Sequence, residues 1–124
     1  MKETLLFAVI MTIIDMIWIR TFMYPKYKTW FRSLNLRIDI KILSIIFAYA
    51  TMVIVYPLFI KNKDSKRELL NAALIGGIIF AFYGFTLAGI FPNYGLDFAF
   101  TEVIWGVILY TSTTYILQKI LSIV

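Results

Sequence analysis

The chain has 124 residues, of which 61% are hydrophobic and only 15% charged, and its mean hydropathy is +0.85. This composition is too apolar for a soluble domain of that length, so the bilayer must be its solvent. Because the sequence contains no cysteine and no histidine, disulfides, thiolate metal sites and histidine acid–base catalysis are excluded. We therefore expect no cofactor and no metal ion, and no nucleic-acid partner despite 12 basic against 7 acidic residues.

Four apolar segments predict an all-α fold, a single domain over residues 1–124 that forms a bundle of four transmembrane helices. The segments cover residues 4–24, 42–60, 69–91 and 98–118. The second is uncharged and, at about 1.5 Å per residue, spans roughly 28 Å, close to the thickness of the hydrocarbon core. The first is the weakest because Asp15 and Arg20 interrupt it, so we expect the other helices to stabilise its insertion. We interpret it as a retained span rather than a signal peptide.

The linker at residues 25–41 is basic, with aromatic side chains interleaved. Two interpretations fit it equally well: a short amphipathic segment at the level of the lipid headgroups, or an ordinary basic loop with an aromatic belt. In both, its basic residues are expected to face anionic lipid headgroups. These residues are Lys26, Lys28, Arg32 and Arg37.

The linker at residues 61–68 is short and highly charged, and we expect Asp64 or Ser65 to cap the following helix. Basic residues divide equally between the two faces of a four-span topology, so their count leaves the orientation open. We favour a multi-pass protein with both termini in the cytoplasm, because the amino terminus adds a positive charge on that side. The sequence does not identify the membrane, and we expect a viral or bacterial one. Isoleucine is the commonest residue, which suggests an AT-rich genome such as that of a large DNA virus or parasite.

The third span carries a row of small residues with spacings of four, four, three and four. On a helix such residues lie on one stripe, where a neighbouring backbone can approach closely. We predict helix packing there, with a cavity or a dimer contact as the less favoured alternative. The stripe consists of Ala73, Gly77, Ala81, Gly84 and Ala88.

Two acidic residues lie inside apolar segments, and each is followed three residues later by tryptophan. Asp15 precedes Trp18 in the first span, and Glu102 precedes Trp105 in the fourth. A carboxylate within a lipid-spanning segment costs several kcal/mol, so this pair is the best indication of a functional site. The four-span topology puts both in the same half of the bilayer, about 13 Å and about 6 Å from its surface.

We expect these four residues to form an intramembrane polar site with Tyr83 and Thr86, which lie at similar depth in the third span. Carboxylates in low dielectric can exchange protons near neutrality, or hold a cation with assistance from tryptophan faces. The alternative is structural: Asp15 pairs with Arg20 or a hydroxyl, and Glu102 reaches the nearby surface. No nucleophile, phosphate-binding loop or metal-ligand spacing occurs in the sequence, so we assign no catalytic residue.

Four features follow one another along the chain: Asp15-x-x-Trp18, the aromatic and basic first linker, the segment Phe82-Tyr83-Gly84-Phe85-Thr86-Leu87-Ala88, and Glu102-x-x-Trp105-Gly106. This order resembles domain-of-unknown-function family 2177, small predicted membrane proteins with four spans, over nearly the whole chain. Members of that family typically read Tyr-Asp-Leu-Thr-Asn in the third span and Asp-x-x-Trp-Gly in the fourth. Here Gly84, Leu87 and Glu102 stand in place of Asp, Asn and Asp. The resemblance therefore implies a divergent member, and it implies no activity, since the family has none assigned.

Two functional interpretations follow. We favour a structural or accessory membrane protein that binds lipid or partner membrane proteins, as a homo-oligomer or within a larger membrane assembly. The alternative is a small proton-coupled transporter, or a lipid or solute binder, that uses Asp15 and Glu102. An enzyme ranks third, because two carboxylates without histidine, metal ligands or a nucleophile offer little mechanism.

Overall fold

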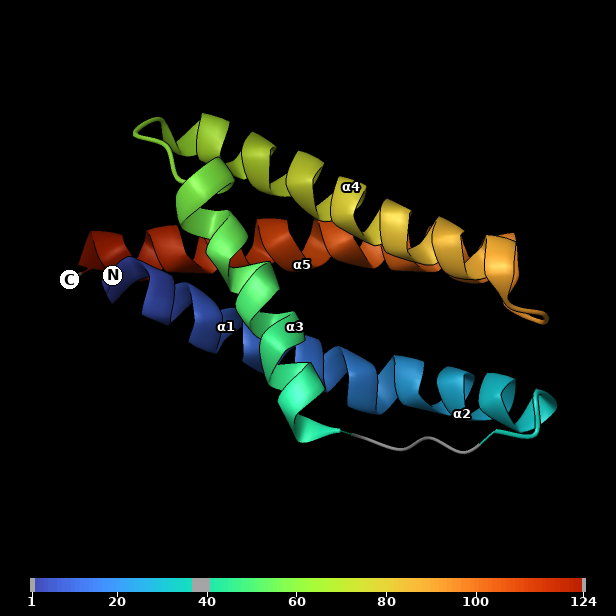
Figure 1. Ribbon diagram of the computed structural model, residues 1–124. Helices are drawn as coiled ribbons and strands as arrows, with labels where there is room; N and C mark the ends of the chain where they lie inside the picture. Colours follow the sequence, from blue (N-terminus) through green and yellow to red (C-terminus); the bar gives the residue numbers. More distant parts are fainter. Residues whose placement is uncertain (1, 37–40, 124) are drawn as a thin grey trace.

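The computed structural model describes residues 2–36 and 41–123, and all regular elements in these two ranges are helices (Figure 1). The first helical rod is continuous and comprises α1 (Lys2–Trp18), the π-helical segment η1 (Ile19–Met23) and α2 (Tyr24–Ser33). The second comprises α3 (Ile42–Val55) and the π-helical segment η2 (Tyr56–Ile60). Two long helices follow, α4 (Ser65–Ile90) and α5 (Leu96–Ile123). The predicted all-α fold is confirmed.

By length and composition, three helices in the described ranges can cross a membrane, namely Lys2–Ser33, Ile42–Ile60 and Ser65–Ile90. The fourth helix of the bundle, α5, is 28 residues long and carries several polar side chains, of which Glu102, Thr113 and Thr114 are buried. Large apolar side chains point outward instead, as at Ile13, Ile78 and Phe82, which are 56%, 63% and 77% exposed. Such a surface suits hydrocarbon and not water.

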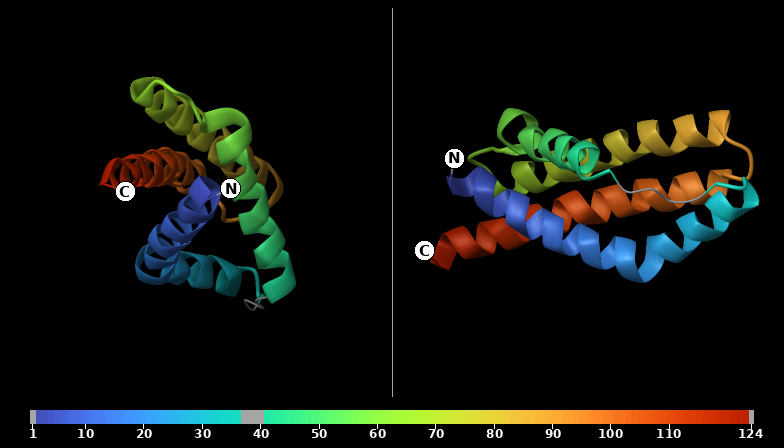
Figure 2. Two further views of the ribbon diagram at one scale, coloured as in Figure 1. Left: turned by 90° about the vertical axis from the view of Figure 1, so that its left-hand side faces the viewer. Right: turned by 60° about the horizontal axis from the view of Figure 1, so that its bottom comes forward.

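Both π-helical segments coincide with prolines. Pro25 follows η1 by two residues and Pro57 lies within η2. A proline cannot donate the usual helical hydrogen bond and crowds the preceding turn, so the helix widens there. The amides of Tyr24 and Lys61 accordingly donate to the carbonyls of Ile19 and Tyr56, five residues back. The consequence for the fold is a bend between α1 and α2 (Figure 2).

The first helical rod extends beyond its predicted end at residue 24. The linker from residue 25 was predicted as either a short amphipathic segment at the headgroup level or a basic loop. In the structure the helix of the first span continues through α2 to Ser33, and the chain turns at Asn35, whose φ is 59°. The helical rod continues because its aromatic side chains find partners on the α4–α5 turn, where Trp30 donates to the carbonyl of Pro92 at 2.9 Å. At the other end, Asp64 caps α4 by accepting from the amide of Lys66 at 3.1 Å.

The closest helix pair is α4 with α5, and glycines set its spacing. A Cβ built on Gly76 would overlap the carbonyl oxygen of Gly106, and one built on Gly106 would overlap that of Gly76. Further along, a Cβ on Gly84 would lie 3.2 Å from the backbone of Ala99. Close backbone approach of this kind is how helices associate where lipid provides no hydrophobic drive.

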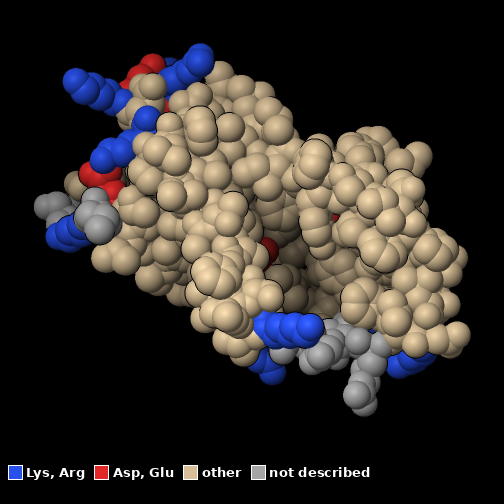
Figure 3. Space-filling model, viewed as in Figure 1, with Lys and Arg blue, Asp and Glu red and all other residues tan. Residues whose placement is uncertain are grey.

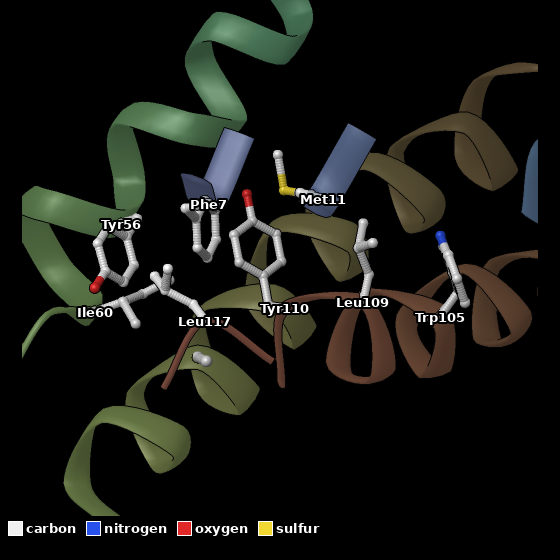
Figure 4. Close-up of a cluster of buried hydrophobic side chains, with 9 residues drawn as sticks. Phe7, Met11, Tyr56, Ile60, Trp105, Leu109, Tyr110 and Leu117 are labelled. Atoms are coloured by element: carbon white, nitrogen blue, oxygen red, sulfur yellow. The ribbon is translucent and has the colours of Figure 1, made fainter. Parts of the chain in front are cut away.

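The main core lies between α1, η2 and α5. Figure 4 shows its labelled side chains, with Phe7 beside Tyr56 and Tyr110. The rings of Phe7 and Tyr56 stack with centroids 4.6 Å apart, and the Tyr110 hydroxyl donates to the carbonyl of Met52 at 2.8 Å. Along α5 the buried residues recur every three or four positions, which turns one face of that helix inward.

Helix α3 crosses the bundle obliquely, and its first turn lies part-way along the molecule, whereas α2 continues beyond it (Figure 1). The described ends of the chain and the α3–α4 turn lie together at one end of the bundle, and the α4–α5 turn lies at the other (Figures 1 and 2). Because α3 is shorter and inclined, it leaves part of the surface between α2 and α4 uncovered.

Candidate functional site

Asp15 is buried where three helices meet. Its side chain is on α1 and is only 6% exposed. The Tyr49 hydroxyl of α3 donates to its Oδ2 at 2.5 Å, and the Trp105 Nε1 of α5 donates to its Oδ1 at 3.0 Å. Each oxygen thus has a donor from a different helix, an arrangement that offsets part of the cost of removing a carboxylate from water.

The two tryptophans of the repeated motif lie against each other. The rings of Trp18 and Trp105 stack with centroids 4.2 Å apart and planes inclined by 7°. Trp105 uses its indole N–H on Asp15, but the buried Nε1 of Trp18 has no hydrogen-bond partner in the described part of the chain. The Asp-x-x-Trp segment of α1 and the Glu-x-x-Trp segment of α5 therefore meet through their aromatic rings.

Glu102 occupies a second polar position next to the first. It lies on α5 just under one helical turn before Trp105 and is 4% exposed. The Tyr27 hydroxyl of α2 donates to its Oε1 at 2.6 Å, and the Tyr83 hydroxyl of α4 lies 3.3 Å from that of Tyr27. The two tyrosine hydroxyls form a short polar path from Glu102 toward the surface between α2 and α4.

A cluster of aromatic rings surrounds this path at the end of the bundle that holds the α4–α5 turn. Tyr94 of that turn lies with its ring centroid 4.9 Å from that of Trp30 and 4.5 Å from that of Phe98. Its buried hydroxyl has no hydrogen-bond partner within the described ranges. Burial, together with the negative charge of nearby Glu102, raises the pKa of Tyr94, so the phenol keeps its proton and remains a donor.

A groove of about 710 Å³ opens between α2, the start of α3 and the second half of α4. Figure 3 shows the molecule hollowed at this place, with acidic atoms visible at the bottom of the hollow. Most of the lining is apolar, and Tyr27 and Tyr83 belong to it. The polar path from Glu102 therefore ends in an apolar groove on the membrane-facing surface.

The structure brings together five of the six residues that the sequence analysis assigned to an intramembrane site. Asp15, Trp18 and Trp105 form one contact set, and Glu102 and Tyr83 belong to the adjoining set around Tyr27. The sixth, Thr86, does not join them. It is exposed on α4, and no side-chain hydrogen bond within the described ranges joins it to the other five.

The structure agrees with the structural alternative at Asp15, which accepts from a hydroxyl, that of Tyr49, but not at Glu102. In the described ranges the ion pair found is between Lys61 and Glu3, with atoms 2.8 Å apart, so Asp15 is held by a hydroxyl and an indole and not by Arg20. Arg20 is exposed. Glu102 turns inward to Tyr27 and does not extend to the surface.

The small-residue stripe was placed one position away from the closest helix contact. Gly77 and Gly84 do approach α5, since a Cβ on Gly77 would lie 3.1 Å from a methyl group of Val107. Gly76, which is not part of the predicted stripe, makes the closer approach. Of the stripe, Ala73, Gly77, Ala81 and Ala88 are partly exposed, and Gly84 is buried.

The headgroup-binding residues predicted in the first linker fall mostly on α2. Lys26, Lys28 and Arg32 are exposed there, and Lys26 lies 4.2 Å from the ring centroid of Phe22. Arg37 lies outside the described residues. No group of three acidic side chains in the described ranges could hold a metal ion.

Sequence reasoning missed three polar residues that the structure places in buried contacts. Tyr49 lies seven residues into the second span, at the depth of Asp15, so a search for a donor at matching depth could have found it. Tyr27 gave no such signal, because it was assigned to a surface linker. Glu68 accepts from the amide of Asn62 at 3.0 Å and from Gln118 at 2.9 Å, which joins the α3–α4 turn to α5.

Comparison with known protein families gives one match. The model of the family described as Predicted membrane protein (DUF2177) matches residues 1–117, nearly the entire chain. The chain belongs to this family. The DUF2177 match confirms the resemblance found in the motifs and makes the protein an integral, multi-pass membrane protein. No curated protein and no solved structure gave a match.

This chain differs from the DUF2177 motif of the third span at Gly84. The resemblance sets Gly84 at an acidic position, and here a Cβ at Gly84 would already lie 3.2 Å from Ala99. A larger side chain there requires a wider α4–α5 spacing. The polar group of this chain is instead formed by Glu102 with tyrosines from α2 and α4.

Proposed function

We propose that the protein is a small accessory membrane protein that binds a lipid-like amphiphile in the groove between α2, α3 and α4. One observation carries the proposal: an apolar groove of about 710 Å³ is lined by the two tyrosines that lead to a buried carboxylate. An apolar recess with few polar groups at one end is the usual form of a site for a small amphiphilic molecule.

The position of the groove supports access from the bilayer. Its walls come from helices whose outer faces carry exposed apolar side chains, such as Phe82 and Phe91, at 77% and 41% exposure. A ligand with an alkyl chain can therefore enter laterally without leaving hydrocarbon. The polar end of the ligand would meet the hydroxyls of Tyr27 and Tyr83.

Photolabelling in detergent or liposomes tests this binding. A hexadecanol that carries a diazirine is neutral and amphiphilic, and it should label α2, the start of α3 and the second half of α4. Leu87→Trp, which fills part of the groove, should strongly reduce this labelling, whereas Leu74→Trp, at a 53% exposed position of the same helix, should not. Even labelling of all outward-facing residues, unaffected by Leu87→Trp, would contradict the proposal.

A second candidate function, a proton-coupled carrier, is favoured by the burial of Glu102 and by its tyrosine path to the groove. A carboxylate that alternates between a proton and a ligand is the simplest means of such coupling. Proteoliposomes with an imposed pH gradient should then show solute uptake that Glu102→Gln abolishes and Glu3→Gln preserves. Uptake unchanged by Glu102→Gln would exclude this role.

The exposed basic residues of α2 support a further part of the proposal, contact with anionic lipid headgroups through Lys26, Lys28 and Arg32. The end of the bundle that holds the α3–α4 turn is also basic, so charge does not distinguish the two ends. We retain the cytoplasmic placement of both termini as a proposal, together with assembly into a homo-oligomer.

A further inference from the structure

Glu102 is a buried carboxylate without a balancing positive charge in the described part of the chain. It is 4% exposed and accepts from Tyr27 at 2.6 Å, whereas Asp15 receives a donor at each oxygen. The ion pair found in those ranges, Lys61 with Glu3, lies at the end where the chain begins. An ionised carboxylate removed from water costs several kcal/mol unless it is paired, so Glu102 either carries a proton or is ionised with a cation nearby.

Aromatic rings dominate the walls of the adjoining groove. A cation held against the face of a tyrosine, tryptophan or phenylalanine ring is stabilised by the ring quadrupole, most strongly where water is excluded. Six of the lining residues provide such rings: Tyr24, Tyr27, Trp30, Phe31, Tyr83 and Phe91. The unpartnered hydroxyl of Tyr94, on the ring packed against Trp30, adds a polar group beside Glu102.

The remaining lining restricts the size and polarity of the occupant. Leucine and isoleucine, together with Ser44 and Lys41, complete the walls, so a hydrated metal ion or a small ammonium ion would leave most of the volume without contacts. The charged residue among the lining residues is Lys41, which is exposed and therefore screened by solvent and headgroups. The apolar lining of the groove therefore favours an ion with apolar substituents.

We propose that the groove binds a lipophilic cation, a quaternary ammonium, phosphonium or protonated amine with large apolar substituents, whose positive charge lies against Tyr27 and Tyr83, with the carboxylate of Glu102 behind their hydroxyls. The proposal rests on the proposed binding of an amphiphile in the same groove and specifies the charge of that ligand. It assigns to Glu102 the role of counter-ion and to the aromatic rings the role of a cage.

Tetraphenylphosphonium and tetraphenylborate, ions of nearly the same shape and opposite charge, provide the test. Equilibrium binding to the purified chain in dodecyl maltoside should be saturable for the phosphonium and absent for the borate. Glu102→Gln should weaken phosphonium binding by at least about tenfold, while Glu102→Asp, which keeps the charge, should retain most of it. Glu3→Gln, which removes an equal charge at the far end of the bundle, should have no effect.

The outcomes separate this inference from the proposed function. Equal binding of both ions, or phosphonium binding unaffected by Glu102→Gln, would overturn the cation preference and leave an apolar groove that photolabelling can still confirm. If neither ion binds and the diazirine alcohol labels α2 and α4 no more than other surfaces, both proposals fall. Should Glu102→Gln not fold, the comparison of the two ions on the unmodified chain still decides the question.

Discussion

The two buried carboxylates in the interior of this protein differ in the number of hydrogen-bond donors that they receive. Asp15 has donors from α3 and α5 on both oxygens. Glu102 has one tyrosine donor, and that tyrosine also faces Tyr83 in the groove. The first arrangement connects three helices, and the second leaves capacity for a ligand. At the scale of the residue, we therefore propose that Asp15 contributes to stability and Glu102 to binding.

Removal of the Tyr49 hydroxyl tests the structural assignment of Asp15. Tyr49→Phe keeps the ring but leaves one buried carboxylate oxygen without its donor, which should lower the free energy of unfolding by about 1 to 2 kcal/mol. Thermal unfolding in dodecyl maltoside measures the effect. Tyr115→Phe is the matched control, because Tyr115 is 50% exposed, and it should change little. Equal stability of the two variants would mean that Asp15 does not depend on this hydrogen bond.

At the scale of the helices, the packing of α4 against α5 depends on glycine. Their spacing follows from the mutual approach of Gly76 and Gly106, where neither helix has room for a methyl group. The conformational cost of glycine within a helix is then offset by the close contact of two backbones. Gly89, near the end of α4, has open space around its Cα and no such role.

Glycine-to-alanine variants of α4 should separate these positions. Gly76→Ala forces the helices apart and should destabilise the protein by roughly 1 to 3 kcal/mol, because the obstacle is backbone and cannot rotate away. Gly89→Ala should be neutral or stabilise by up to about 1 kcal/mol through helix propensity. Gly77→Ala, which meets only a valine methyl, should fall between them. Unfolding in increasing fractions of sodium dodecyl sulfate gives the order, and a Gly77 variant less stable than the Gly76 variant would contradict this packing.

The arrangement of the whole molecule defines two ends. The α3–α4 turn and the described chain ends lie at one, and the α4–α5 turn lies at the other (Figure 1). In a membrane the two turns must therefore face opposite compartments, whichever orientation the protein adopts. The groove opens laterally between these ends, as a site that takes ligands from the bilayer requires.

Single cysteines can test this arrangement, since the sequence has none of its own. Lys63→Cys in the α3–α4 turn and Leu96→Cys at the start of α5 are both at exposed positions. In sealed vesicles, a membrane-impermeant maleimide should modify one of them and not the other, and permeabilisation should expose the second. Modification of both from one side would be incompatible with helices that cross the membrane. The side that reacts first establishes the orientation, which the even division of basic residues left open.

Part of the candidate site was predictable from the sequence. The two Asp/Glu-x-x-Trp motifs led to Asp15, Trp18, Glu102 and Trp105, because acidic residues within apolar segments are costly and need partners. Tyr83 followed from its depth in the third span. Tyr27 did not, since its place beside Glu102 depends on α2 continuing beyond the bend and turning a face toward α4 and α5. Thr86 was wrongly included because depth along a helix does not determine which side of it a residue faces.

The sequence alone determined the all-α membrane fold, the family and the presence of polar residues that require burial. Those properties depend on composition and on periodicity within single segments, both of which are local. Only the tertiary structure decided which donors meet which carboxylate, which glycine bears the closest contact, and where a groove remains. These depend on the bend at η1, the tilt of α3 and the approach of α4 to α5. Pro25 accounts for the bend, but the tilt and the approach arise from contacts between side chains distant in the chain.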